Sequence, residues 1–71
     1  MSLKDANVGQ TYIIENIKTN DDEVNSFLFR LGCYSGEPIT IMSKKRKGII
    51  VSIKDGRYNF DNLLAESILV H

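Results

Sequence analysis

Two spacings of hydrophobic residues along the chain predict two kinds of element. Between residues 10 and 17, β-branched and aromatic residues dominate and alternate imperfectly, which predicts a first strand with both faces partly covered. Between Asp21 and Leu31, apolar residues instead recur at i, i+3, i+4 and i+7, as expected for a helix that buries one face. The residues of that face are Val24, Phe27, Leu28 and Leu31.

Both ends of the predicted helix carry boundary signals. Asn20 is placed to cap the first turn, and Glu23, three residues later, can reach back to it. Gly32 follows the helix, at the position where a left-handed conformation costs glycine little. Gly36 and Pro38 then favour a turn and a strand entrance. The chain is therefore expected to change from helix to strand over this short stretch.

Two further strands are expected after the turn. Ile39 and Ile41 share one face of the first, which fades into a polar connection over residues 43–48 that is typical of a hairpin. The second is the clearest strand of the chain, and alternation turns three of its residues inward. They are Ile49, Val51 and Ile53.

Asp55 and Gly56 form the strongest tight-turn signal, because a two-residue hairpin loop needs positive φ at both positions. A return strand is expected over residues 57–60, with Tyr58 and Phe60 on one face.

The last segment predicts a helical turn and a closing strand. Asp61 can cap a turn over residues 62–66, and residues 68–70 suit a short strand. Five short strands, with one helix between the first and second, predict a mostly β fold. We expect a small five-stranded barrel, whose closure would remove exposed strand edges.

Size and composition bound the class of protein. A chain of 71 residues is expected to form one domain, residues 1–71, with a small core. Nine basic and nine acidic residues balance, so no global field favours nucleic acid or an acidic membrane. A single cysteine excludes an internal disulfide and fits a reducing compartment. The chain has no signal-peptide pattern and no apolar run long enough to span a bilayer, so we expect a cytoplasmic protein that is not membrane-inserted.

No residue constellation predicts catalysis. The one histidine, His71, ends the chain, where fraying is expected, and no Ser-His-Asp or Cys-His pair is credible. Gly32 and Gly36 are followed by Glu37, which does not fit a phosphate-binding loop. We therefore expect no enzyme activity and no cofactor.

No metal site is expected either. The carboxylates of residues 21–23 are explained by a helix start, because adjacent helical residues point about 100° apart and suit the helix dipole. Cys33 has no partner cysteine and is interpreted as a small buried apolar residue.

Two groups of residues are candidates for partner binding. The first lies at the helix end, where tyrosine and arginine are residue types that anchor interfaces. The second is the only dense charge cluster, which suits a solvated hairpin, an acidic protein partner or nucleic-acid phosphates. Few aromatic residues and no tryptophan argue against a stable nucleic-acid complex. The two groups are Phe29, Arg30, Cys33 and Tyr34, and Lys44, Lys45, Arg46 and Lys47.

The order of these motifs resembles the ferrous iron transport protein A family, FeoA, over almost the whole chain. The matching segments are Leu3–Gly9, Tyr12–Ile17, Leu28–Gly32, Gly36–Ile41, Val51–Gly56 and Ala65-Glu66-Ser67-Ile68-Leu69-Val70. Cys33 stands where the family usually has an aliphatic residue, and Ser35 where proline is common. Both departures alter the turn after the helix.

The resemblance implies an SH3-like barrel that serves as a non-catalytic accessory of ferrous iron uptake. Its implied partner is the membrane ferrous iron transporter, FeoB, contacted on its cytosolic GTPase or membrane part. An arginine supplied to the partner's GTP site is a minor alternative mechanism, with Arg30, Arg46 and Arg57 as candidates. A small nucleic-acid-binding barrel and a relative of the C-terminal domain of metal-dependent repressors remain alternatives. Homo-oligomerisation stays open.

Overall fold

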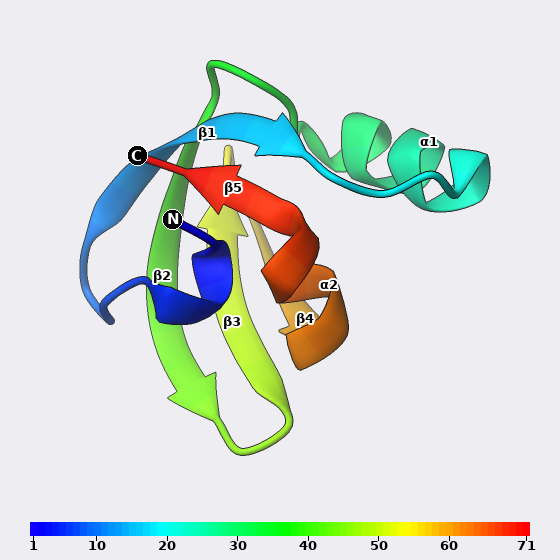
Figure 1. The fold of residues 1–71 in the computed structure, drawn as a ribbon. Coiled ribbons are helices and arrows are strands. Elements are labelled where there is room, and N and C mark those ends of the chain that lie inside the picture. Colours follow the sequence, from blue (N-terminus) through cyan, green and yellow to red (C-terminus); the bar gives the residue numbers. More distant parts are fainter.

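Five antiparallel strands form one sheet in the computed structural model, which describes residues 1–71 (Figure 1). The strand order is β4-β3-β2-β1-β5. The elements, in chain order, are the 3-10 helix η1 (Leu3–Asp5), β1 (Thr11–Ile17), α1 (Asp22–Leu31), β2 (Pro38–Lys45), β3 (Gly48–Ile53), β4 (Gly56–Asp61), α2 (Asn62–Ser67) and β5 (Ile68–Val70). The predicted five strands, and the helix between the first two, are confirmed.

The expected closure into a barrel is not observed. Strands β4 and β5 lie at the two ends of the sheet and do not pair with each other. The helix α2 joins them instead, because the cap at Asp61 turns the chain out of β4 before β5 begins. The chain ends pack onto β5 and β1: the Val70 amide donates to the carbonyl of Met1 at 2.8 Å, and the His71 amide to that of Ile13 at 2.9 Å. The end of the chain is therefore paired rather than frayed.

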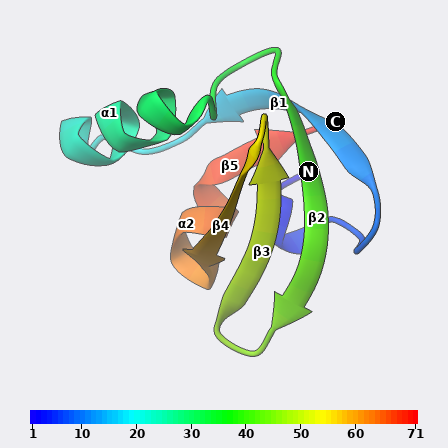
Figure 2. The same ribbon diagram turned by 180° about the vertical axis from the view of Figure 1, so that it is seen from behind.

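The core lies inside the curve of the sheet and is sealed by η1 and α2 (Figures 1 and 2). Every strand contributes to it, and the predicted inward face of β3 is confirmed. No buried residue is polar or charged. The fourteen core residues are Leu3, Ala6, Ile14, Leu28, Cys33, Ile39, Ile41, Ile49, Val51, Ile53, Phe60, Ala65, Ile68 and Val70.

Helix α1 extends away from the sheet, and its C-terminal end lies nearest to the body of the molecule (Figures 1 and 2). Of the four residues predicted to be buried, only Leu28 is fully so, while Phe27 remains 45% exposed. Val24 and Leu31 are half-buried and pack against the core, so the predicted stripe is covered in part at both ends of the helix, and only Phe27 is left exposed. Gly32 ends the helix at φ 90°, as predicted.

The predicted N-cap of α1 was wrong by one residue. Asp21 caps the helix, with its carboxylate accepting from the amides of Glu23 at 2.9 Å and Val24 at 3.3 Å. The Asp21 amide is itself bound by the hydroxyl of Thr19 at 3.2 Å. This local turn moves the start of the helix past Asn20.

The first hairpin turns more tightly than the sequence suggested, and the turn of the second lies one residue earlier than predicted. Strand β2 ends at Lys45 and β3 begins at Gly48, which leaves a two-residue turn between them. In the second hairpin the turn is formed by Lys54, at φ 53°, and Asp55, whereas Gly56 already pairs with Ile53. Glycine at position 56 makes room for Tyr58, because a Cβ there would fall 2.9 Å from Cε2 of its ring. Gly56 does not have a positive φ, so the predicted reason for glycine at this position is wrong.

Candidate functional site: an apolar groove between the two helices

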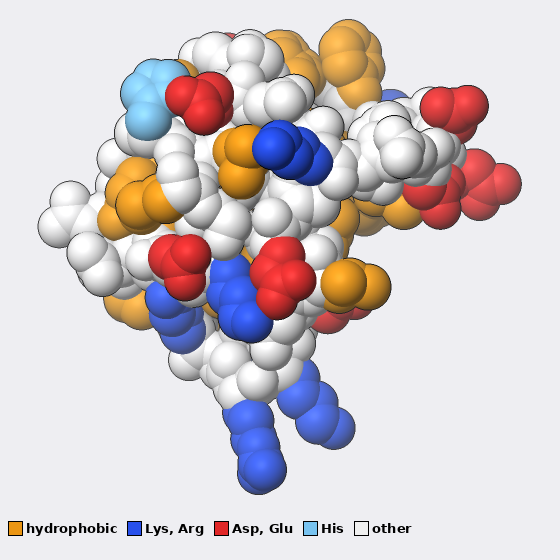
Figure 3. All heavy atoms as spheres, viewed as in Figure 1, with side chains coloured by type: hydrophobic (Ala, Val, Ile, Leu, Met, Phe, Trp, Pro, Cys, Tyr) orange, Lys and Arg blue, Asp and Glu red, His pale blue; other side chains and the backbone are white.

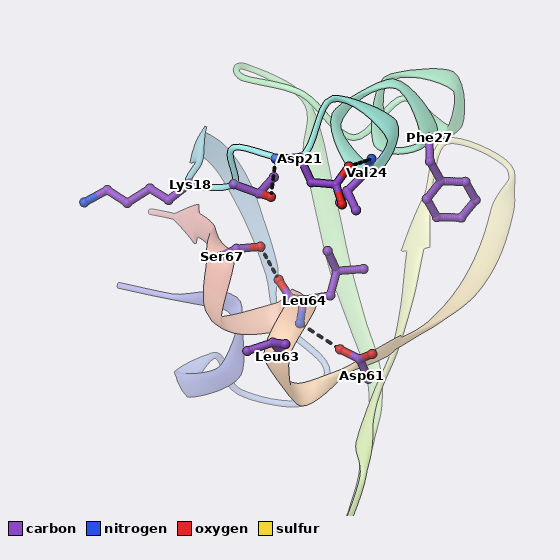
Figure 4. Close-up of a pocket in the computed structure, with 9 residues that line it drawn as sticks. Lys18, Asp21, Val24, Phe27, Asp61, Leu63, Leu64 and Ser67 are labelled. Carbon is purple, nitrogen blue, oxygen red and sulfur yellow. Dashed lines mark hydrogen bonds between the residues drawn. The ribbon is translucent and has the colours of Figure 1, made fainter.

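A groove of about 560 Å³ lies between α1 and α2 (Figure 4). Val24 and Phe27 reach into it from α1, and Leu64 points up from α2. Leu63 lies on the α2 side and is 77% exposed, the highest exposure of any large apolar residue here. Apolar side chains left open to water in a concave site are typical of a binding surface. The complete lining is Lys18, Thr19, Asp21, Val24, Phe27, Asp61, Leu63, Leu64 and Ser67.

Hydrogen bonds hold the two walls of the groove in place. Asp21 caps α1, and Asp61 caps α2 by accepting from the Leu64 amide at 2.8 Å. The end of β1 is tied to the end of α2, since the Lys18 amide donates to the carbonyl of Ser67 at 2.6 Å. The Ser67 hydroxyl in turn donates to the carbonyl of Leu64 at 2.7 Å. The backbone that carries the apolar lining is therefore fixed at both walls.

The rim of the groove is mainly acidic. Asp21 and Asp61 line it, and Lys18 is the only basic residue among the lining. A second hollow adjoins the groove along α1, shares Phe27 with it and is lined partly by Asp22 and Glu23. Red side chains accordingly surround the outer end of α1 in the space-filling view (Figure 3). The site combines an apolar floor with negative charge at its edge.

Sequence reasoning missed this groove. Phe27 was assigned to a buried stripe, and Leu63 was given no role. One local signal was available: Leu63 and Leu64 are adjacent in a one-turn helix, and neighbouring helical residues point about 100° apart. Only one of the two leucines could face the core directly, so the other was a candidate for an exposed contact.

The predicted helix-end group is partly assembled on the surface. Phe29 is 65% exposed and stacks on Tyr34 with ring centroids 4.9 Å apart. The ammonium of Lys54 lies 5.8 Å from the Tyr34 ring centroid and pairs with Glu37. The hydrogen bond to Glu37 raises the pKa of Lys54. This cluster remains a candidate contact surface.

Cys33 does not belong to that surface. Its side chain is only 1% exposed, because the turn after Gly32 directs it into the core. Burial raises the pKa of the Cys33 thiol to about 11. The thiol therefore stays protonated near neutral pH, which fits the small buried apolar role that the sequence predicted.

The basic group lies at the opposite end of the molecule from the helix end. Lys44 and Lys45 end β2, and Arg46 and Lys47 form the turn (Figure 1). Lys44 donates to the carbonyl of Lys4 at 2.9 Å. The two predicted groups thus form two separate surfaces.

The structure contains no group of three or more His, Cys, Asp or Glu side chains arranged to hold a metal ion. His71 lies 3.5 Å from a carboxylate oxygen of Glu15. No helix in it has the length and hydrophobicity required to cross a membrane.

The curved five-stranded sheet and its covering helices define a small SH3-like β domain. Within that class, the chain belongs to the FeoA domain family, whose model matches residues 1–71. No match was found among curated proteins.

Three solved structures illustrate the likeness. An iron uptake regulatory protein, FeoA, is 24% identical with a TM-score of 0.84, over 99% of this chain and 92% of that one. The zinc-complexed FeoA of Stenotrophomonas maltophilia is 18% identical with a TM-score of 0.86, over 100% of this chain and 89% of that one. It is described as an SH3 domain protein and a candidate ferrous iron transport activating factor. A manganese-dependent transcriptional repressor is 17% identical with a TM-score of 0.88, over 99% of this chain but 40% of that one. At these identities the likeness establishes the fold.

Proposed function

We propose that this chain is a non-catalytic, cytoplasmic accessory protein of ferrous iron uptake that docks on the cytosolic side of a FeoB-type membrane transporter. Family membership over residues 1–71 is the observation that carries the proposal. The groove between α1 and α2 is the docking surface that we assign to it.

The groove favours a partner segment with two features. Its apolar floor, with Leu63 and Phe27 exposed at 77% and 45%, suits one or two large apolar side chains. Its rim of Asp21 and Asp61 suits lysine or arginine beside them. Both carboxylates also serve as helix caps, so they are held in position before a partner arrives. We therefore expect a basic, amphipathic segment of the transporter to occupy the groove.

Docking alone would not regulate transport. A bound accessory shifts a conformational equilibrium only by its difference in affinity for the two states. The proposed function thus requires that the transporter present the basic segment differently in different nucleotide states. A tenfold shift needs a difference of about 1.4 kcal/mol, which one apolar anchor can provide.

The test is recovery of the detergent-solubilised transporter by the tagged chain in each nucleotide state. Leu63→Ser and Phe27→Ser are each expected to weaken binding about 30-fold, as for an anchor worth about 2 kcal/mol. Because Leu63 is exposed, its replacement should change stability by less than about 0.5 kcal/mol. Val8→Ser, at a site 53% exposed, is the matched control and should bind normally.

Phe29→Ser separates the groove from the helix-end cluster of Phe29, Arg30 and Tyr34. If Phe29→Ser abolishes recovery and the two groove variants do not, the contact lies at the helix end and our groove assignment is wrong. If the wild-type chain recovers no transporter in any nucleotide state, the accessory function itself is wrong.

A second candidate is a contact domain of the kind that forms part of a longer metal-dependent repressor. Its support is the TM-score of 0.88 with a manganese-dependent transcriptional repressor. Such a domain has no reason to recover the transporter, so the same experiment separates the two functions. The nucleic-acid alternative is tested separately, by salt titration against oligonucleotides.

A further inference from the structure

The β2–β3 hairpin ends in a basic tip, which we define as Lys44, Lys45, Arg46 and Lys47. All four residues are exposed, and the turn itself consists of Arg46 and Lys47. Basic side chains project from the lower end of the molecule, where the hairpin lies (Figures 1 and 3). The backbone beneath is fixed, since the side-chain amide Nδ2 of Asn62 donates to the carbonyl of Arg46 at 3.0 Å. The tip is thus a turn with a fixed backbone and exposed cationic side chains, of which Lys44 donates to the carbonyl of Lys4.

Charge is divided unevenly between the basic tip and the rest of the chain. Four of the nine basic residues lie in the tip, which carries +4, and the remaining five basic and nine acidic residues leave −4 elsewhere. None of the four is in an ion pair. One carboxylate, that of Asp61, lines a hollow with Lys45 and Lys47, and it already caps α2. Most of the positive charge of the tip is therefore not neutralised within the protein and can interact with an external partner.

We propose that the basic tip binds the anionic headgroups of phospholipids at the membrane surface. The choice of lipid rests on the proposed function, which brings the chain to the inner face of a membrane. Geometry supports it, because a protruding tip can touch a planar surface while the acidic start of α1 lies on another side of the molecule (Figures 1 and 2). The molecule measures 28 × 22 × 21 Å, and the screening length near physiological salt is about 8 Å. The repulsion between the acidic body and the headgroups is therefore largely screened.

Nucleic acid and an acidic protein fit the tip less well. A single strand is usually held by aromatic residues beside the charge, and residues 42–48 contain none. Phe60, on the strand next to the hairpin, is buried. A duplex or an acidic protein would extend past the tip along a body of net charge −4, whereas a bilayer surface meets the tip alone.

Each lysine or arginine near an anionic surface contributes a factor of about five in binding. The four basic residues together predict that half of the protein is bound at about 1 mM accessible lipid. Such weak binding alone would leave most of the protein free, but it adds a second attachment to a chain already docked on a membrane protein. Two linked attachments raise the overall affinity without a tighter contact at either.

The test is co-sedimentation of the purified chain with vesicles of phosphatidylcholine containing about 30% phosphatidylglycerol, at about 0.1 M salt. The variant Lys45→Gln/Arg46→Gln/Lys47→Gln should bind about a hundredfold more weakly. The matched control Lys18→Gln/Arg30→Gln/Arg57→Gln removes the same charge from three exposed residues outside the tip that are in no ion pair. It should bind the vesicles no more weakly than the wild type. Salt at about 0.5 M should release the wild-type chain.

Three results would overturn the proposal: no sedimentation of wild type at low salt, equal binding to vesicles of phosphatidylcholine alone, or equal weakening of both triple variants. Tighter binding to an oligonucleotide than to the anionic vesicles at the same salt would reassign the tip to nucleic acid. No transporter is present in this experiment. Its failure is therefore distinct from a failure of the accessory function, which is tested in detergent without a bilayer.

Discussion

Leu28→Ala is expected to detach α1 from the body of the protein while the sheet stays folded. Leu28 is the only fully buried residue of α1, at 1% exposure. The other core residues come from the strands, η1, α2 and the loops, so they remain packed when α1 melts. Loss of α1 would also remove Val24 and Phe27 from the groove and abolish docking.

The magnitude follows from the packing. Replacing a buried leucine by alanine costs about 3 kcal/mol, including the cavity that is left. A helix of ten residues is not stable by itself in water, because isolated helices shorter than about 12 residues are marginal. A domain of this size has only about 3 to 5 kcal/mol of total stability. If α1 unfolded together with the sheet, the variant would be close to unfolding completely.

Amide hydrogen exchange measures the difference between these outcomes. In the variant, the amides of residues 27–31 should exchange nearly as fast as in an unfolded chain. Those of β2 and β3 should change by less than about tenfold. Ser26→Ala, at an exposed position of the same helix, is the control and should leave exchange in α1 within about threefold of wild type.

A parallel loss of protection in α1 and in the β2–β3 hairpin would refute this reasoning, since α1 would then belong to one cooperative unit with the sheet. An unchanged α1 would refute it as well, because Leu28 would not be its anchor.

Two further predictions concern the close contact between the backbones of β3 and β4 and the pH dependence of stability. Gly48→Ala should lower the free energy of unfolding, measured in urea, by about 2 kcal/mol, because the added Cβ would meet the carbonyl of Phe60 on the paired strand. A change below about 0.5 kcal/mol would contradict this steric explanation. The pKa of Cys33 is raised from 9.0 to about 11 in the folded state, so the stability it contributes is full below about pH 9 and lost as the pH rises through 11. The pKa values of Lys4 and Lys54 are raised by their carboxylate partners in the wild type and in Cys33→Ala alike, so a difference between the two pH profiles reports on the thiol. The loss of stability at high pH should be smaller in Cys33→Ala, and identical profiles would argue against a buried thiol.

Much of the secondary structure could be predicted because its signals are local. Alternation placed Ile49, Val51 and Ile53 on the inner face of β3, and all three are buried. Gly32 ended the helix because the left-handed conformation there favours glycine in any tertiary context. Boundaries were less accurate, since neighbouring residues compete for the same role. The cap moved from Asn20 to Asp21 in this way.

The docking groove could not be predicted, because its two walls are distant in sequence. Val24 and Phe27 come from α1, and Leu63 and Leu64 from α2, and nothing local indicates that these helices face each other across a hollow. The amphipathic pattern of α1 assumed a neighbouring surface along the whole helix. The structure covers that face fully at Leu28 and in part at Val24 and Leu31, and it leaves Phe27 exposed.

The sequence by itself determined the strands, the turns, the position of α1 in the chain and the charged hairpin, because each depends on the conformational preferences of a few adjacent residues. Only the tertiary structure decided how much of the predicted apolar side of α1 is covered, and that the sheet ends at β4 and β5. Burial and exposure depend on which distant elements pack together. The apolar residues left without such a neighbour became the candidate docking surface.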